Sequence, residues 1–367
     1  MMNSNRKNAA LGAHVRRLCS SGLNPKVVIP PVVAALRELV RAEWGFFYFA
    51  DAQFELSDVY SENPAFFDVL PQYLAEIHNS PAQDVLGVRF SDAMRRGRGY
   101  GNTDWYGHAV FEGAGYEYIM RPLGIRHALE QTASYNGRGW GAIQLQRPPG
   151  SRPFSEHDEA TLAIFRTHLA HALTAPDMPV TDYAASGSSG VLVTDATGKL
   201  LLASPEALQC VALANGGPPG FCGREQVPLW LRALIANFVA LWNGQDRPPC
   251  LMVRRNSTGL FRIRAYCFDE HASNGDLPTI AVHVEHHPPL ALQVETLGFR
   301  FGLSERQRDL CGDLLEGLTY AEVSRRRAIR ESTVVTHARE MFRKLEIHDR
   351  AALHTRFPSL GDSVLAE

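Results

Sequence analysis

The residues of this chain best suited to recognition chemistry lie between Glu331 and Leu345. If this stretch is an α-helix, apolar residues at i, i+4, i+7 and i+11 share one face: Val334, Ala338, Met341 and Leu345. The opposite side then presents Val335, Thr336, Arg339 and Arg343. An arginine fork can bond O6 and N7 of guanine together, and a valine can contact the thymine methyl group. We therefore expect these four residues to contact DNA bases, with Arg339 as the first choice.

Two shorter segments would position this helix. Residues 304–316 have a helical pattern that Gly317 ends, and a short helix begins after Thr319, a suitable N-cap, and ends near Arg327. Two helices joined by a tight turn, the second amphipathic and arginine-bearing, indicate a helix-turn-helix. Phosphate contacts, which fix the register on DNA, are expected from Thr333, Lys344, Arg325 and Arg326. A solvated face is the competing interpretation of Arg325 to Arg327, and a solvated or phosphate-bonding role is that of Arg339.

This segment resembles the C-terminal DNA-binding domain of LuxR-type transcriptional regulators. The resemblance is carried by Leu303, Arg306, Leu314, Gly317, Leu318, Glu322, Ile329, Thr333, Val334, His337, Lys344, Leu345 and Arg350. It implies a regulator that binds double-stranded DNA, and two-fold operators predict a homodimer. The sequence departs from the family in having Gln307 for Glu, Arg327 for an apolar residue, Arg330 for a small capping residue and Val335 for Lys. Arg327, Arg330 and Val335 motivate an alternative, a protein-interaction dimer whose degraded helix-turn-helix no longer binds DNA.

A second candidate site comes from aromatic residues. Residues 44–140 hold 19 of the 34 Phe, Tyr and Trp residues. They could line a pocket for a small apolar or aromatic metabolite, with Asp104 or Arg121 orienting its polar end. The other candidates for this pocket are Trp44, Phe46, Tyr48, Tyr60, Tyr100, Trp105, Tyr116 and Tyr118. Ordinary core packing of these aromatics is the alternative.

The first 290 residues contain two patterns of strands and helices. A helix around Val32 to Val40, opened by Pro30 and Pro31, precedes a strand at 44–50; a strand at 141–146 precedes a capping box at Ser155 and a helix to about Leu173. This resembles a GAF domain. A hairpin at 190–205, helices at 205–214 and 228–242, and strands at 251–255, 260–268 and 279–285 resemble a PAS domain. Both resemblances imply α+β sensor or dimerisation domains with antiparallel sheets, followed here by an all-α domain.

Charge and linker composition divide the chain further. The net charge is −2, but residues 300–357 hold 12 Lys and Arg against 9 Asp and Glu. The run of small and turn-forming residues at 174–189 and the His-His-Pro-Pro sequence at 286–289 indicate linkers. We expect three domains: residues 1–178 (GAF-like), 186–290 (PAS-like) and 296–367 (helix-turn-helix).

Other chemistry finds little support in the sequence. No nucleophile elbow, P-loop or zinc-like cysteine grouping is present, so we expect no enzyme, cofactor or metal. His283, Glu285 and His287 alternate as metal ligands could, although an exposed polar edge is the better interpretation. The 15-residue apolar stretch at 228–242 is too short for a membrane helix and indicates a core helix. The N-terminus lacks a signal-peptide pattern, which predicts a cytoplasmic protein without membrane association.

Overall fold

The computed structural model describes residues 2–80, 89–103, 111–217, 227–245, 251–267 and 279–360, with only the backbone of 2–5, Tyr100 and Cys267. The chain divides into two compact units. The N-terminal unit comprises residues 1–178 with 211–224, and the C-terminal unit comprises residues 179–210 with 225–367. Each unit contains one five-stranded sheet. The expected boundaries of three domains stay a prediction.

Two helices open the N-terminal unit, α1 (Met2–Cys19) and α2 (Pro25–Val40). The side chain of Asn24 accepts a hydrogen bond from the Lys26 amide at 2.9 Å, so α2 begins before Pro30 and Pro31 and contains both prolines. The expected start at these prolines is therefore wrong. Each proline removes one backbone donor, but burial of the valines and isoleucine on both sides of them keeps the helix intact.

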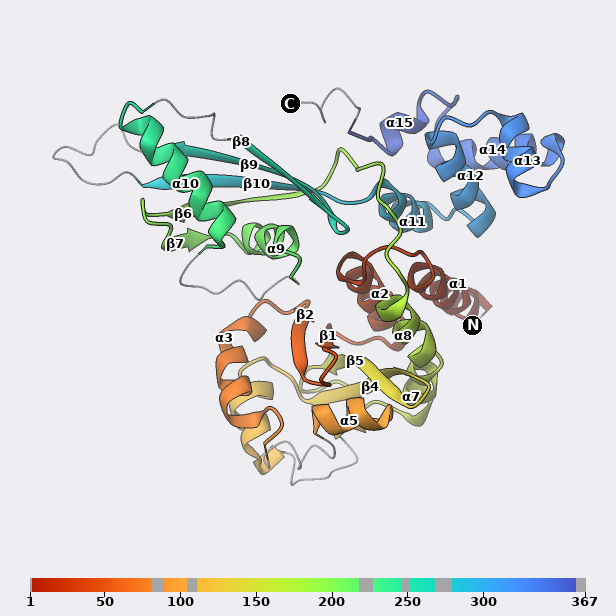
Figure 1. The fold of residues 1–367 in the computed structure, drawn as a ribbon. Coiled ribbons are helices and arrows are strands. Elements are labelled where there is room, and N and C mark those ends of the chain that lie inside the picture. Colours follow the sequence, from red (N-terminus) through yellow and green to blue (C-terminus); the bar gives the residue numbers. More distant parts are fainter. Residues whose placement is uncertain are drawn as a thin grey trace. The chain divides into compact units, whose positions relative to one another are not determined.

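The first sheet has the order β2-β1-β5-β4-β3, and all its neighbouring strands are antiparallel. Its strands are β1 (Trp44–Ala50), β2 (Leu56–Ser61), β3 (Tyr100–Asn102), β4 (His127–Tyr135) and β5 (Arg138–Arg147). Helices α2, α7 and α8 contact one face, and α3 and α5 lie over the other with the π-helices η1 and η3 (Figure 1). The bounds are α3 (Phe66–Gln72), η1 (Tyr73–Ile77), α5 (Phe90–Arg96), η3 (Tyr116–Met120), α7 (Glu156–Ala163) and α8 (Arg166–Thr174).

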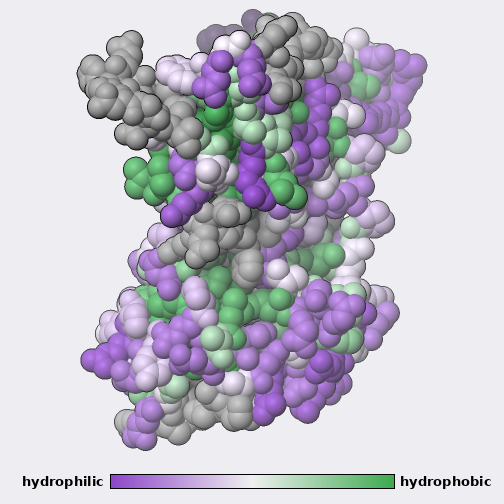
Figure 2. All heavy atoms as spheres, turned by 60° about the vertical axis from the view of Figure 1, so that its left-hand side comes forward, coloured by the Kyte–Doolittle hydropathy of each residue, from purple (hydrophilic) through white to green (hydrophobic). Residues whose placement is uncertain are grey.

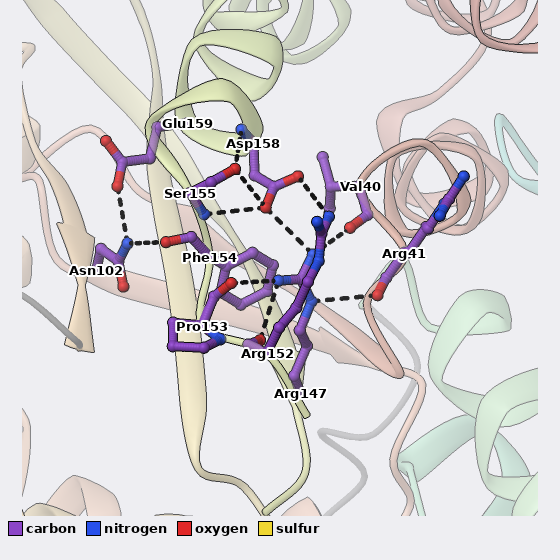
Figure 3. A network of polar contacts seen from close by, with 10 residues as sticks. All are labelled: Val40, Arg41, Asn102, Arg147, Arg152, Pro153, Phe154, Ser155, Asp158 and Glu159. Carbon is purple, nitrogen blue, oxygen red and sulfur yellow. Dashed lines mark hydrogen bonds and ion pairs between the residues drawn. The ribbon is translucent and has the colours of Figure 1, made fainter. Parts of the chain in front are cut away.

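The capping box expected at Ser155 is confirmed, with Asp158 as its partner. The long helix expected to follow it is instead divided into α7 and α8 at Ile164 and Phe165, and Ile164 is 61% exposed. Asp158 also contacts the buried guanidinium of Arg147 (Figure 3). Arg147 donates further hydrogen bonds to the carbonyls of Val40, Arg41 (3.2 Å), Arg152 (3.2 Å) and Pro153 (2.9 Å). One arginine thus joins the end of α2, strand β5 and the start of α7.

The second sheet repeats the strand order of the first, as β7-β6-β10-β9-β8, with antiparallel neighbours. The expected α+β fold class, two antiparallel sheets flanked by helices and then a helical domain, is confirmed. The strands of the second sheet are β6 (Ser188–Thr194), β7 (Leu200–Ala203), β8 (Leu251–Asn256), β9 (Gly259–Cys267) and β10 (Ile280–His287). Its helices are α9 (Pro205–Ala214) and α10 (Leu229–Trp242).

Polar side chains cover most of one face of the protein. Figure 2 shows hydrophilic side chains over most of the face drawn there, with smaller hydrophobic areas among them. Some of the exposed apolar side chains lie on the second sheet, at Val191, Leu202, Val253 and Tyr266. Within the described part of the chain, no helix is both long and apolar enough to cross a membrane.

Five helices follow β10 (Figure 1). They are α11 (Leu290–Arg300), α12 (Glu305–Leu315), α13 (Tyr320–Arg327), α14 (Glu331–Leu345) and α15 (Leu353–Arg356). All five helices share one hydrophobic core. Capping boxes at Ser304 and Thr319 begin α12 and α13, and Gly317 between these helices has a φ of +95°, which favours glycine. The sequence therefore predicted the bounds of α12, α13 and α14 closely.

Candidate nucleic-acid interface and N-terminal cavity

Helix α14 has the two faces that the sequence predicts. Val334, Ala338, Met341 and Leu345 are buried. On the other side Thr336, Arg339 and Arg343 are exposed, and Val335 is half-buried. The Thr336 hydroxyl donates to the carbonyl of Ser332 at 2.9 Å. Neither Arg339 nor Arg343 forms an ion pair or hydrogen bond with another described residue, so both guanidinium groups are available for an external acceptor.

The start of α14 lacks a side-chain cap. Arg330 occupies the N-cap position and its side chain makes no capping hydrogen bond. Ala328 in the preceding turn has a φ of +51°, and the Ser324 hydroxyl donates to the Ile329 carbonyl at 2.6 Å, which fixes the turn. The first amides of α14, beside half-buried Thr333, therefore remain without a side-chain acceptor, and a phosphate oxygen can bind such amides.

A buried carboxylate compensates the unexpected arginine at the end of α13. The Nε and Nη2 atoms of Arg327 donate to the two carboxylate oxygens of Asp313 at 2.8 and 3.0 Å. Asp313 is only 2% exposed and also accepts from Arg326 at 3.1 Å. Arg326 forms a second ion pair with Glu316. The charge of Arg327 is thus paired, and the guanidinium of Arg326, expected on a phosphate, is already engaged within the domain.

The other two basic residues with expected phosphate contacts, Arg325 and Lys344, differ in how strongly their charged groups are already hydrogen-bonded within the domain. Arg325 is exposed and makes one long hydrogen bond, to the Ala321 carbonyl at 3.4 Å. The ammonium group of Lys344 donates to the carbonyl of Gly302 and to Oε1 of Gln307, both at 2.8 Å. Gln307, one of the departures from the family pattern, completes the capping box of α12 and holds Lys344 there. The phosphate contacts of Arg325, Arg326, Lys344 and Thr333 stay predictions.

Helix α11 attaches to this domain through a buried ion pair that sequence inspection missed. Nε of Arg308 on α12 donates to Glu295 on α11 at 3.0 Å, and both residues are buried. Arg308 also donates to the Leu303 carbonyl at 2.7 Å. A Cβ atom at Gly298 would lie 2.9 Å from Cγ of Arg308, so the absence of a side chain there makes room for the arginine. The Glu and Arg stand 13 positions apart, and no local spacing links them.

The segment that precedes the second sheet also contacts the helical domain. Tyr183 pairs with Pro289 and Ala184 with Ser359 in isolated β-bridges. The Ala185 amide donates to the Pro358 carbonyl at 2.7 Å, and the Leu360 amide donates to the Tyr183 carbonyl at 2.9 Å. Ala184 is fully buried in the same hydrophobic core as α11 and α14. Residues 183–185 therefore lie between the start of α11 and the chain after α15.

The N-terminal unit contains a cavity of about 100 Å³ between its sheet and the layer formed by α3, η1, α5 and η3. Tyr48, one of the candidate residues, lines it. Phe46, Trp44 and Tyr116 belong to or pack against the surrounding hydrophobic cluster without lining the cavity. The side chains of Tyr100, Asp104 and Trp105 lie outside the described residues.

Three further candidates for the pocket lie elsewhere. Tyr60 pairs with Phe47 in register, and because side chains alternate along a strand, it points to the face opposite Tyr48. Tyr118 is 48% exposed, and the exposed Arg121 pairs with Glu117 at 2.8 Å. The structure therefore does not place these three candidates in the lining of the cavity, because a count of aromatics ignores the face on which each residue lies.

Polar residues that the sequence analysis missed form one wall of the cavity. Glu130 on β4 accepts a hydrogen bond from Nε2 of Gln144 on β5 at 3.1 Å. Oε1 of Gln144 accepts from the Tyr48 hydroxyl at 3.3 Å and from Nε2 of Gln146 at 2.6 Å. Burial raises the pKa of Glu130 to about 7 and raises that of Tyr48 as well. The signal in the sequence was the alternation of Gln144 and Gln146 with apolar residues, which places two amides on one face.

The candidate ligands on the second sheet do not converge. His283 and Glu285 lie on the outer face of β10, the central strand, and not at an edge of the sheet. Nδ1 of His283 and Nε2 of His287 lie 3.7 and 3.8 Å from different oxygens of Glu285. Among the residues that the structure describes, no group of three or more His, Cys, Asp or Glu side chains could hold a metal ion.

Comparisons with known proteins place one part of this chain in a family. Residues 302–357 match the family described as bacterial regulatory proteins, luxR family. Among curated proteins none matches the chain. Similar solved structures include Escherichia coli SdiA (13% identity, 89% of this chain and 87% of that chain, TM-score 0.28). They also include the GAF domain of cyanobacteriochrome TePixJ (19% identity, 38% of this chain and 83% of that chain, TM-score 0.26). A third is a phycoerythrobilin-bound GAF domain from a cyanobacterial phytochrome (13% identity, 45% of this chain and 94% of that chain, TM-score 0.30). Residues 302–357, with their capped helices and exposed arginines, are a helix-turn-helix domain of the luxR family of bacterial regulatory proteins.

Proposed function

We propose that this protein is a DNA-binding transcriptional regulator in which the N-terminal domains bind a small molecule, or pair two copies of the chain, and so control the helix-turn-helix. The single observation that carries the proposal is the free outer face of α14. Arg339 and Arg343 have no partner among the described residues, although other arginines of this domain are paired. An arginine kept unpaired on the solvent side of a recognition helix suits a guanine or a phosphate.

The control would act through populations of two arrangements. A ligand that binds one arrangement of the N-terminal domains more tightly increases its population, and so changes the spacing of two helix-turn-helix domains in a homodimer. The contacts of α11 with α12 support this proposal. Because the Glu295 to Arg308 pair is buried, a change in the position of α11 must move α12 or break the pair.

The alternative is a protein-interaction dimer with a degraded helix-turn-helix. Two of the departures that motivate it, Arg327 and Arg330, do not require that DNA binding is lost. Arg327 replaces an apolar residue without leaving a buried unpaired charge, because Asp313 accepts both of its hydrogen bonds. Arg330 leaves a helix end uncapped but exposed, where water or phosphate can satisfy the amides.

Selection of bound duplexes from a random DNA pool, followed by gel shifts of the full chain, tests the proposal. We expect a selected duplex to bind more tightly than a scrambled one at moderate salt, and size-exclusion chromatography with light scattering to give a dimer. Arg339→Ala should cost about 1–3 kcal/mol on the selected duplex and relax its specificity at one base step.

Arg300→Ala removes an exposed arginine at the end of α11, just before the domain, and serves as the matched control. It should change binding little. If no duplex is enriched, the regulator proposal fails and the interaction protein is favoured. If Arg339→Ala weakens all sequences equally, the base-reading assignment is wrong and Arg339 contacts phosphate.

A further inference from the structure

The polar wall of the N-terminal cavity has a direction. Glu130, when ionised, can only accept hydrogen bonds, so Gln144 must turn its amide nitrogen toward it. Oε1 of Gln144 then accepts from Tyr48 and Gln146, and the nitrogen of Gln146 is turned toward Gln144. The hydrogen bonds in this chain therefore run toward Glu130, from Tyr48 and Gln146 to Gln144 and from Gln144 to the carboxylate.

Gln146 has an unpaired acceptor, and Glu130 has no cationic partner among the described residues. Gln146 is 3% exposed, and its Oε1 atom has no hydrogen-bond partner. Glu130 accepts one hydrogen bond, from Gln144, and forms no ion pair with a described residue. A buried acceptor without a partner costs free energy, and a half-buried carboxylate without a cation costs more. Each deficit would be removed by the same kind of group, an N–H donor with positive charge.

The remaining described lining of the cavity is mainly apolar and partly aromatic. Phe66, Tyr73 and Phe90 line it beside Tyr48, with aliphatic residues of η3 and the following loop that include Ile119, Met120, Leu123 and Ile125. Thr103 is a polar lining residue, and its hydroxyl oxygen accepts a hydrogen bond from the Ala128 amide at 2.9 Å. Aromatic faces attract a cation, and the aliphatic side chains bury an apolar body. Among the described residues that line the cavity there is no lysine, arginine or histidine, so an anionic ligand would meet Glu130 without a compensating charge from these residues.

We propose that the ligand of this cavity is a small apolar amine whose ammonium group pairs with Glu130 and Gln146 while its hydrocarbon part contacts Phe66 and Phe90. The proposal deepens the sensing role and rests on that proposed function for its meaning, but binding itself requires no DNA. The space of about 100 Å³ is several times what a single water needs and suits a compact ring or short chain.

The charged and titratable neighbours of Glu130 define the expected pH dependence. Tyr48 and Tyr73 face it in the cavity, and His78 lies behind Tyr73, bonded to its hydroxyl. Across β4, Glu130 also borders a hollow lined by Arg98, Arg166, Glu156 and Glu159. Because burial places the pKa of Glu130 at about 7, its carboxylate is mostly ionised at pH 8 and mostly protonated at pH 6.

Isothermal titration of the full chain at pH 8 with benzylamine, benzyl alcohol and benzoate tests the proposal, because the three probes share one ring and differ in charge. We expect benzylamine to bind at least tenfold more tightly than benzyl alcohol, and benzoate not to bind. Affinity for benzylamine should fall about tenfold in Glu130→Gln and severalfold at pH 6. Gln146→Met, which removes the unpaired acceptor and keeps the carboxylate, should weaken it about threefold.

Glu117→Gln is the matched control, since it neutralises an exposed carboxylate on η3, the helix that carries Ile119 and Met120. It should leave binding unchanged. Equal affinity for benzylamine and benzyl alcohol, no binding of benzylamine at millimolar concentration, or no effect of Glu130→Gln and Gln146→Met would overturn the proposal. Arg339→Ala must bind benzylamine as the wild type does, so a failure of DNA binding and a failure of ligand binding remain separate results.

Discussion

Replacing Glu130 by Gln in the ligand-free protein should remove a pH-dependent loss of stability. Burial raises the pKa of Glu130 from the ordinary 4.5 to about 7 in the folded chain. A carboxyl group whose pKa is higher in the folded than in the unfolded chain destabilises the fold only when it is ionised. Below about pH 4.5 Glu130 is protonated in both the folded and the unfolded chain, so it does not lower the stability of the wild type there. The loss of stability grows as the pH rises toward 7 and reaches its full size above pH 7.

The pKa values set the size of this effect. A difference of about 2.5 pKa units corresponds to roughly 3–4 kcal/mol at about 1.4 kcal/mol per unit. Glu130 is half-buried, and contact with solvent in the cavity reduces this ceiling, so we expect about 1–3 kcal/mol. Gln resembles the protonated carboxyl group in shape and charge. Glu130→Gln should therefore match the wild type near pH 4.5 and exceed its stability at pH 8.

Thermal unfolding from pH 4.5 to 8, followed by tryptophan fluorescence, measures the effect, because Trp44 packs against the cluster that surrounds the cavity. For a unit of this size each kcal/mol shifts the midpoint by about 2–4 °C. Asp58, whose pKa is also raised by burial, to about 6, is present in both proteins and cancels in the difference. A difference between the two proteins that stays constant from pH 4.5 to 8 would refute the reasoning.

Two further predictions concern buried ion pairs. Arg147→Met should destabilise the N-terminal unit by about 3–5 kcal/mol in the same unfolding experiment, because it removes the buried cation beside Asp158 and the donor to several carbonyls. Arg147→Lys should not restore stability, since it lacks the planar fork, and an unchanged midpoint for either variant would contradict this. Asp313→Asn should cost the helix-turn-helix about 1–3 kcal/mol, less than a fully buried pair because Arg326 and Arg327 are partly exposed. Faster amide exchange in α12 and α13 of the full chain would be its measure, and unaltered exchange there would show that Asp313 does not hold α13.

The sequence predicted best those elements that are specified locally. The capping boxes at Ser304, Thr319 and Ser155 need only residues three positions apart, and the apolar positions of α14 repeat with the period of a helix. Strand β1 was predicted to the residue because it is a short, continuous apolar run. The start of α2 was wrong because a local rule about proline competed with burial of residues distant in sequence, which no local pattern displays.

The candidate sites were predicted unevenly. The exposed positions Arg339 and Arg343 followed from helical geometry alone. The partners of Arg326 and Lys344 did not, because Asp313 and Gln307 lie on another helix, 13 and 37 residues away. Counting aromatics located the region of the cavity and the lining residue Tyr48, but missed Glu130. That residue became visible only once the register Phe46, Gln144, Glu130 was known across three strands.

Residues 183–185 determine the order in which the chain forms its contacts along the sequence. The segment begins five residues after Met178, the last residue of the first stretch of the N-terminal unit. It touches both Pro289 and Ser359 before the chain enters β6. The polypeptide that leaves residue 178 thus meets the helical domain before it builds any strand of the second sheet. Strands β6 to β10 therefore lie, along the chain, between two segments that contact each other directly, residues 183–185 and the start of α11.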